Sequence, residues 1–372
     1  MSIFHTLKVK TIQRQTSDAV AVSFEVAEDL KKSFEYTPGQ YITFRVNVKG
    51  ETYNRSYSLC SAPVLNEDLT VAVKQVLGGK VSTFINKELK EGDILEGMEP
   101  LGNFKAEIEK NDNTHFILFG GGSGITPLFS ILKTALHKAE KTTVTLFYAN
   151  YNTETVIFRN EIAAFQKQFE GRFKVIHIFD KPKKVGGFLG FGKKTDEQLP
   201  FVEGMLTKDK CLELLRTETN SNYVNAQFYM CGPGGFMDSV SAALNVLQIP
   251  KEKVHREYFT EKSEKDKEAA VVGNADDNFE GVSKVHITYD GKTTVIDVDT
   301  KDKILDRALD EDIDPPFACM VGACTTCRAK VIEGSIKMDD SDALTDKEIA
   351  AGYVLTCQSH PKSAVVKVSY DE

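Results

Sequence analysis

Residues 316–331 read PFACMVGACTTCRAKV, and residues 353–361 read YVLTCQSHP. Together they carry four cysteines, Cys319, Cys324, Cys327 and Cys357. Four residues separate the first two and two separate the next two, which is the plant-type spacing for the thiolate ligands of a 2Fe–2S cluster with a distant fourth thiolate. A structural zinc site also takes four thiolates, although zinc fingers and ribbons usually pair their ligands as two close couples. The spacing predicts a 2Fe–2S cluster and leaves zinc as the alternative.

The length and composition are typical of a multidomain globular protein. The chain has 372 residues, 27% charged and 41% hydrophobic, so two or three domains are expected. The N-terminal residues lack the apolar core of a signal peptide, and no apolar run is long enough to span a membrane. Cys60, Cys211 and Cys231 remain outside the ligand set, which fits a reducing compartment. With a net charge of −8 and no basic stripe, we expect a cytoplasmic enzyme without a nucleic-acid partner.

The first hundred residues show the period-two alternation of strands. It appears at 19–26, 41–48 and 69–76, with turn residues between these segments. Short strands at this density predict a closed antiparallel β-barrel, which we assign to residues 1–108. Within it lies Arg55-Ser56-Tyr57-Ser58, whose alternate side chains would face opposite sides of a strand. The cationic side chain of Arg55, the flat ring of Tyr57 and the serine hydroxyls form a pattern that fits an extended dinucleotide ligand.

Residues 109–260 predict a nucleotide-binding α/β domain with a parallel sheet. A buried strand leads into a glycine-rich turn (120–124) and an amphipathic helix, for which Thr126 is the expected N-cap. Glycines let the backbone approach a pyrophosphate, and a helix N-terminus offers it free amides. Further strands are expected at 142–150 and 173–180, and a last one ends at Cys231-Gly232-Pro233. Ligands of open α/β sheets gather at that end of the strands.

Two features of this domain stay open. The strand at 142–150 ends in Asn150-Tyr151-Asn152, where an arginine often selects the 2′-phosphate of NADP, so the choice between NADH and NADPH is unsettled. The loop at 181–200 is rich in lysine and glycine and longer than typical connections. We interpret it as a solvated insertion, with a flap over the nucleotide or a docking surface as alternatives.

Residues 261–282 are charged and poor in large apolar residues, which is typical of a flexible linker. Beyond them, alternating segments flank Asp290-Gly291, a strong hairpin pattern, and residues 303–309 predict a helix. With the cysteine loop, residues 283–372 resemble the β-grasp fold of plant-type ferredoxins. From residue 284 onward there are 17 acidic and 11 basic residues, a net charge of −6. The acidic groups at 306–314 and 339–342 form either a solvated face or a docking patch for a basic partner.

The motifs, in this order, resemble those of the ferredoxin–NADP reductase superfamily over essentially the whole chain. The motifs of the superfamily are matched by Arg55–Ser58 (Arg-x-Tyr-Ser), Gly79–Ser82 (Gly-x-x-Ser before a short helix), Gly122–Pro127 (GxGxxP), Cys231–Pro233 (Cys-Gly-Pro) and Glu257–Phe259 (Glu-x-aromatic). The resemblance implies that Arg55 contacts the flavin phosphates, that Tyr57 packs on the isoalloxazine, and that Ser58 lies near its N5 atom. It also implies that Cys231 positions the nicotinamide and that Phe259 covers the flavin face.

The resemblance therefore implies FAD, a 2Fe–2S cluster and NAD(P)H as co-substrate, and the Gly79–Ser82 element favours FAD over FMN. The residues expected to act in catalysis are Ser58, Cys231, Glu257 and Phe259. Those expected to contact the flavin or the nicotinamide nucleotide are Arg55, Ser56, Tyr57, Ser58, Val73, Lys74, Gly79, Val81, Ser82, Thr83, Gly121, Gly122, Gly124, Ile125, Thr126, Cys231, Gly232, Pro233 and Phe259.

Nicotinamide gives electrons in pairs and a 2Fe–2S cluster accepts them singly, so the flavin between them must split the pair. The resemblance implies that such a fused reductase serves an oxygenase. Among fused reductases, the sequence is most similar to reductase components of multicomponent phenylacetyl-CoA epoxidases, which implies a diiron oxygenase as electron acceptor. Met320 stands where family members usually carry a polar residue. The alternatives are a reductase of another oxygenase, such as a ring-hydroxylating dioxygenase or a hydroxylase, direct reduction of oxygen or ferric chelates, and a non-catalytic 2Fe–2S redox sensor.

Overall fold

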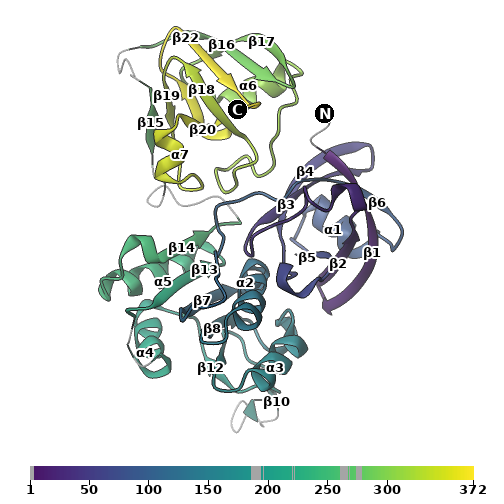
Figure 1. Cartoon of the computed structure of the whole chain (residues 1–372), viewed down its shortest axis with the longest axis vertical. Helices are drawn as coiled ribbons and strands as arrows, with labels where there is room; N and C mark the ends of the chain where they lie inside the picture. Colours follow the sequence, from purple (N-terminus) through teal and green to yellow (C-terminus); the bar gives the residue numbers. More distant parts are fainter. Residues whose placement is uncertain are drawn as a thin grey trace.

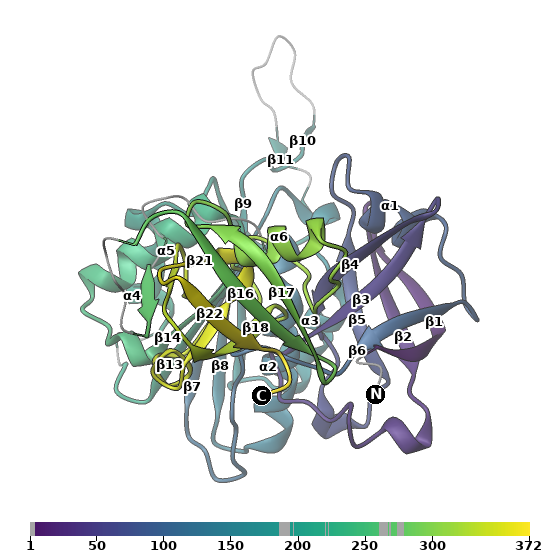
Figure 2. The ribbon, with the colours of Figure 1, turned by 90° about the horizontal axis from the view of Figure 1, so that it is seen from above.

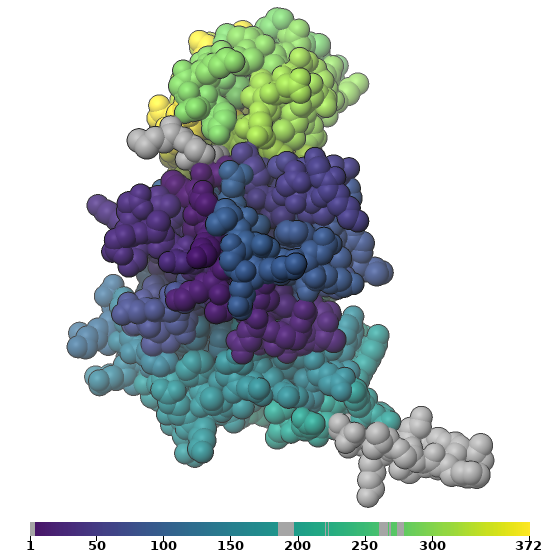
Figure 3. All heavy atoms as spheres, turned by 90° about the vertical axis from the view of Figure 1, so that its right-hand side faces the viewer, coloured from purple at the N-terminus to yellow at the C-terminus, as the bar shows by residue number. Residues whose placement is uncertain are grey.

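The computed structural model describes residues 4–185, 194–195, 197–219, 221, 223–259, 267, 269–273 and 279–372. The chain forms a barrel, an α/β domain and a C-terminal domain, and the C-terminal domain lies at one end of the molecule (Figure 1). Seen from above, this domain lies in front of the other two (Figure 2). In the space-filling view the barrel faces the viewer, with the C-terminal domain above it and the α/β domain below (Figure 3). No helix in the described part of the chain is long and apolar enough to cross a membrane.

The N-terminal domain is a six-stranded antiparallel sheet in the order β4-β3-β6-β1-β2-β5. Its strands are β1 (Phe4–Thr16), β2 (Ala19–Glu25), β3 (Tyr41–Val48), β4 (Glu51–Ser58), β5 (Leu69–Lys74) and β6 (Ile94–Met98). An isolated bridge between Leu59 and Val71 brings the two edges together, so the sheet curls around its buried apolar residues. The predicted antiparallel barrel is confirmed. The short helix α1 (Lys80–Lys87) follows β5, with Gly79 at its N-cap.

The α/β domain has a parallel sheet in the order β12-β9-β8-β7-β13-β14, and the predicted fold is confirmed. Its strands are β7 (His115–Gly121), β8 (Thr143–Asn150), β9 (Phe173–Phe179), β12 (Phe201–Glu203), β13 (Ala226–Cys231) and β14 (Val254–Glu257). The helices are α2 (Ile125–Lys138), α3 (Arg159–Gln168), α4 (Lys208–Glu218) and α5 (Gly234–Val246). The chain leaves β7 towards β8 and returns to β13 on the other side of β7, so the order of the strands reverses between β7 and β13.

One detail of α2 differs from the prediction. Its N-cap is Gly124, not Thr126. The turn Gly122–Gly124 is itself a 3₁₀ helix that runs directly into α2. Thr126 therefore lies inside the first turn, where its hydroxyl donates to the carbonyl of Ser123 at 3.0 Å.

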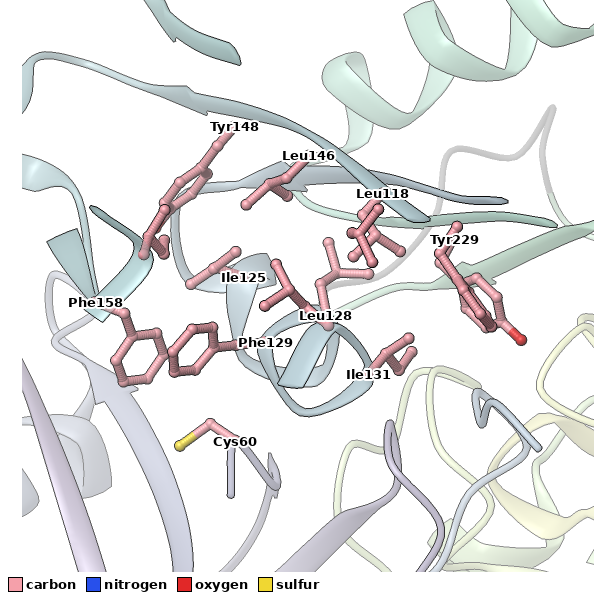
Figure 4. Close-up of a cluster of buried hydrophobic side chains, with 14 of the residues drawn as sticks. Cys60, Leu118, Ile125, Leu128, Phe129, Ile131, Leu146, Tyr148, Phe158 and Tyr229 are labelled. Carbon is pink, nitrogen blue, oxygen red and sulfur yellow. The ribbon is translucent and has the colours of Figure 1, made fainter. Parts of the chain in front are cut away.

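The barrel and the α/β domain share one apolar core. Figure 4 shows α2 at its centre, where the rings of Phe129 and Phe158 stack with centroids 4.4 Å apart. Cys60 and Ala72 of the barrel belong to the same cluster of buried side chains. The buried ammonium of Lys133 on α2 pairs with Glu67 of the barrel. These two domains are therefore joined as tightly as the interior of a single domain.

The C-terminal domain contains a five-stranded mixed sheet, β17-β16-β22-β18-β20, and a three-stranded sheet, β15-β19-β21. Its elements are β15 (Ala270–Val272), β16 (Val282–Tyr289), β17 (Lys292–Asp299), α6 (Ile304–Asp310), β18 (Arg328–Glu333), β19 (Ile336–Met338), α7 (Asp346–Ala350), β20 (Tyr353–Leu355), β21 (Ser359–Pro361) and β22 (Val365–Ser369). The predicted hairpin turn joins β16 to β17, with positive φ at Asp290 (51°) and Gly291 (69°), as such two-residue turns require.

The prediction that residues 261–282 form a linker is wrong at Ala270–Val272. These residues form strand β15, which pairs antiparallel with β19, and the side chain of Val272 is buried. Three apolar residues in a charged segment do not predict a strand by themselves, because the partner strand lies far along the chain. Of the same segment, residues 261–266, 268 and 274–278 lie outside the described residues, as do residues 186–193 and 196 of the 181–200 loop.

Candidate electron-transfer site

Two turns meet backbone to backbone where the strand order of the parallel sheet reverses. A Cβ atom at Gly124 would lie 2.0 Å from the carbonyl oxygen of Cys231, and one at Gly232 would lie 3.1 Å from the Cα of Gly121. Gly122 has a φ of +54° and open space beside it. Only glycine permits this approach, and the cradle lies at the N-terminus of α2, where a pyrophosphate is favoured. The residues present therefore fit a dinucleotide.

The predicted catalytic residues Ser58, Cys231 and Glu257 come together from the barrel and the α/β domain. The Ser58 hydroxyl donates to the Glu257 carboxylate at 3.1 Å. Cys231 pairs with Glu257 in the register of β13 and β14. Burial raises the pKa of the Cys231 thiol well above its usual value, and Glu257 adds to this effect when its carboxyl group is ionised. Cys231 is therefore a neutral thiol, which suits positioning rather than nucleophilic attack.

Glu257 lines a cavity of about 520 Å³ between the barrel, the end of the parallel sheet and the cysteine loop. Its surroundings desolvate the carboxyl group and raise its pKa to about 8, and the nearby Cys324 adds to the shift, while the hydrogen bond from Ser58 opposes it. At neutral pH the carboxyl group therefore carries a proton. The Ser58–Glu257 pair can hold or release a proton beside the predicted flavin site.

We expect Glu257 to make stability fall as the pH rises. Between the ordinary pKa of 4.5 and the folded value of about 8, the folded state keeps a proton that the unfolded state has released, so unfolding becomes easier with increasing pH. The full effect is on the order of 5 kcal/mol. The Glu257→Gln variant stays neutral and should show a flatter decline of the calorimetric unfolding midpoint between pH 6 and 9. Glu252→Gln, on the exposed turn before β14, is the control, and equal slopes in both variants would contradict the prediction.

The predicted flavin residues line the barrel near β4 and α1. The exposed side chain of Arg55 lies over the ring of Tyr53, with its guanidinium carbon 5.7 Å from the ring centroid. A Cβ atom at Gly79 would lie 2.6 Å from the Ser82 hydroxyl, and this hydroxyl accepts from the Val76 amide at 3.1 Å. The turn before α1 is thus as tight as a phosphate-binding turn requires. The residues present fit an FAD diphosphate.

The side chains of several other predicted cofactor-binding residues are buried in the core or paired with other residues of the protein. The side chains of Val73 and Val81 lie in the barrel core, so their contribution to a cofactor site would come from the backbone. Lys74 pairs with Asp18 at 3.7 Å, and the hydroxyl of Thr83 accepts from Gln75 at 3.1 Å. Phe259 is 43% exposed, and its role over the flavin stays a prediction.

The four predicted cluster ligands gather in one loop region of the C-terminal domain. Cys324, Cys327 and Cys357 are buried and Cys319 is half-buried. A hydrogen bond with Cys319 and then burial raise the pKa of the Cys324 thiol. In the described part of the chain, no three His, Cys, Asp or Glu side chains converge as they would on a single metal ion. A two-iron cluster spreads its thiolates over two irons, so the donor set fits it without such convergence.

The loop around the ligands is shaped for close backbone approach. Gly322 has a φ of +74°, and Met320 adopts the left-handed region at +60° with 39% of its surface exposed. The Val321 amide donates to the sulfur of Cys319 at 3.5 Å. Amides directed at sulfur stabilise thiolate ligands.

The structure adds three residues that the sequence did not single out: Tyr41, Thr43 and Asn103. The Tyr41 hydroxyl accepts from the Thr325 amide at 2.9 Å, and the Thr43 hydroxyl lies 3.2 Å from that of Thr326. Asn103 donates to the carbonyl of Ala343 at 3.0 Å. Alternation along β3 places Tyr41 and Thr43 on one face, but nothing local indicates that this face meets the cysteine loop.

Three family models match the chain, one for each domain. They are described as an oxidoreductase FAD-binding domain (residues 6–106), an oxidoreductase NAD-binding domain (118–242) and a 2Fe-2S iron-sulfur cluster binding domain (287–362). The last match decides between iron–sulfur and zinc in favour of the 2Fe–2S cluster. The three domains together define an oxidoreductase that uses FAD, a nicotinamide nucleotide and a 2Fe–2S cluster.

Several relatives match over nearly their whole length, including the following two. The chain is 31% identical to one component of the 1,2-phenylacetyl-CoA epoxidase of Escherichia coli (strain K12), over 100% of this chain and 99% of the relative. It is also 31% identical to the ferredoxin reductase component of the 3-ketosteroid-9-alpha-monooxygenase of Rhodococcus rhodochrous, over 98% and 96% of the two chains. The chain belongs to the family of ferredoxin reductases that fuse FAD-binding, NAD-binding and 2Fe–2S domains.

Several solved structures share this architecture, among them the following two. Phthalate dioxygenase reductase superposes with a TM-score of 0.55 at 22% identity, over 98% of both chains. An intact type IV self-sufficient cytochrome P450 monooxygenase gives a TM-score of 0.67 at 20% identity, over 98% of this chain and 41% of the other. At these identities the likeness is evidence for the fold alone.

Proposed function

We propose that this chain is the reductase component of a multicomponent oxygenase, and specifically of a diiron phenylacetyl-CoA epoxidase. The observation that carries the assignment is the junction of the three domains, where Ser58 and Glu257 lie beside the cavity that the cysteine loop closes. The full-length match to a component of a phenylacetyl-CoA epoxidase supports the particular oxygenase. The equally identical steroid monooxygenase reductase makes another oxygenase the second candidate.

When bound, the flavin supplies the chemistry that accepts one hydride, and with it an electron pair, and passes the electrons on singly. The chain's own residues bind the nucleotide, position its nicotinamide, hold a proton and exclude water. The cradle of Gly121, Gly124 and Gly232 holds the nucleotide so that Cys231 faces the nicotinamide. Glu257 holds a proton on its carboxyl group beside the Ser58 hydroxyl, and the burial of the site keeps water away from the hydride path.

Reconstitution tests this function. The purified protein is combined with diiron epoxidase components or with a steroid hydroxylase, each with NADH or NADPH. We expect oxygenated product to accumulate with the epoxidase components and phenylacetyl-CoA. Product formed only with the other oxygenase would replace the epoxidase assignment, and failure of NAD(P)H to reduce the bound flavin would refute the reductase function itself.

The exposed acidic side chains of the C-terminal domain could attract a basic partner protein. Asp306 and Asp312 are exposed, while Asp310 is neutralised by Arg307 at 2.9 Å. The second predicted group differs, because Asp340 is fully buried and Asp339 lies 3.1 Å from His360. We therefore assign the solvated or docking face to the surroundings of α6, and the buried Asp340 does not belong to it.

We expect salt to slow electron delivery to the oxygenase. If the acidic face around α6 steers a basic partner, raising the salt from 0.05 to 0.5 M should lower the partner's reduction rate about tenfold, because screening removes the attraction. Stopped-flow spectroscopy measures this rate, with ferricyanide as the control acceptor, whose reduction should not slow. A partner rate independent of salt would rule out electrostatic docking.

A further inference from the structure

The contact between the barrel and the C-terminal domain differs in kind from the contact between the barrel and the α/β domain. The latter is a continuous apolar core. The former has a small apolar cluster in which Tyr41 packs with Ala318 and Cys324, surrounded by polar pairs. Such a contact is specific in geometry but small, which is typical of a docking surface that can separate.

Tyr41 occupies the centre of this contact. It is 5% exposed, and its hydroxyl accepts from the Thr325 amide at 2.9 Å and lies 3.0 Å from the Thr325 hydroxyl. Thr325 directly follows the ligand Cys324. At the other end, Tyr41 is paired with Ser58 in the register of β3 and β4. One side chain thus connects the strand of the predicted flavin site with the cluster loop.

Two further residues on the same face of β3 continue the contact. The Thr43 hydroxyl lies 2.9 Å from that of Ser56 and 3.2 Å from that of Thr326. The Thr326 hydroxyl in turn lies 3.4 Å from the sulfur of Cys324. A chain of hydroxyl groups therefore runs from the flavin strand to a cluster ligand. At the rim, Arg45 donates to Asp314 at 3.0 Å.

We propose that the face of β3 formed by Tyr41, Thr43 and Arg45 is the seat on which the chain's own C-terminal domain docks to receive electrons, with Tyr41 as the positioning residue. The inference rests on the reductase function proposed above. The transfer that the seat serves moves one electron and no proton from the bound flavin to the cluster, in which one ferric iron becomes ferrous. Two such transfers use the electron pair of the hydride from one nicotinamide. The cluster passes the first electron to its acceptor before it takes the second, and the proton of the hydride is released to water.

The test is Tyr41→Phe in the full chain with its cofactors bound. The loss of a buried hydrogen bond lowers the docking equilibrium, and with it the flavin-to-cluster electron transfer, about tenfold. Flavin reduction by NAD(P)H should keep its wild-type rate, since the nucleotide cradle is untouched. The electron paramagnetic resonance spectrum of the chemically reduced cluster should shift, because the Thr325 amide loses its acceptor. Stopped-flow absorbance separates the two rates.

Tyr36→Phe is the matched control. It removes another phenol hydroxyl, which donates to Ser61 at 2.7 Å within the barrel, and it should leave both rates and the spectrum unchanged. Thr43→Val is a second variant of nearly equal volume and should slow the same step, which keeps the test valid if Tyr41→Phe loses its flavin.

Wild-type transfer and an unshifted spectrum in both Tyr41→Phe and Thr43→Val would overturn the proposal. Equal slowing in Tyr36→Phe would also overturn it, because the effect would then reflect general loosening of the barrel. If NAD(P)H does not reduce the flavin of the wild-type protein at all, this result refutes the proposed reductase function and not the proposed docking face on β3.

Discussion

Replacing Cys324 with serine is expected to abolish electron flow beyond the flavin. Cys324 is buried and shares hydrogen bonds with Cys319 and Thr326, so no other thiol in the loop can take its place without rearrangement. Outer-shell changes cost about 10–100-fold in metal affinity, and the loss of a ligand should exceed that. We expect the iron and sulfide content to fall sharply and cytochrome c reduction to drop by at least about 100-fold, while NAD(P)H still reduces the flavin.

Cys211→Ser is the control for this experiment. Cys211 is a buried free cysteine on α4, in the core of the α/β domain and apart from the cysteine loop. It should retain the cluster and cytochrome c reduction. If Cys324→Ser kept a normal cluster and normal cytochrome c reduction, the ligand assignment would be wrong.

The Gly124→Ala substitution is expected to block hydride transfer from the nucleotide. The added methyl group would lie 2.0 Å from the Cys231 carbonyl oxygen and 2.4 Å from its carbon, and the obstacle is backbone, which cannot rotate aside. The two turns must separate, and a displacement of about 1 Å can cost about 100-fold in rate. Stopped-flow measurement of flavin reduction by NADH and NADPH should show this loss, while FAD and the cluster stay bound.

Gly235→Ala is the matched control. Gly235 lies in the first turn of α5, and a Cβ there meets nothing within 4 Å. Alanine in a helix stabilises by about 0.5–1 kcal/mol relative to glycine, so this variant should reduce its flavin normally. A wild-type rate in Gly124→Ala would show that the close packing of the two turns is not needed for nucleotide binding.

Short-range patterns predicted most of the fold. Alternation located β2, β3 and β5, and Asp290-Gly291 located the hairpin of β16 and β17. Strand β1 (Phe4–Thr16) and β6 were not identified, and β15 was assigned to a linker. Strands β6 and β15 pair with segments distant in sequence, and strand propensity depends on such partners. Strand β1 pairs with its chain neighbour β2 as well as with β6.

The residues of the candidate site also fall into two groups, those predicted from the sequence and those found only in the structure. Spacing and motif order located the four cysteines and the glycine turns, and the resemblance to a known superfamily added Ser58, Cys231 and Glu257. Tyr41, Thr43 and Asn103 were not found, because their function depends on which domain they meet. The acidic residues 339–340 were expected to be solvated or docking residues, and only burial showed that Asp340 belongs to the interior.

The sequence by itself predicted the three domains, because ligand spacing, glycine turns and strand alternation are local constraints on the backbone, and the resemblance to a known superfamily added their cofactors. Tertiary structure alone decided how these domains meet. It brings Ser58 to Glu257, raises the pKa of Glu257 so that it keeps its proton, and places the cysteine loop against β3. The physical reason is that burial and contacts between distant segments arise from packing of the whole chain, and no local pattern records them.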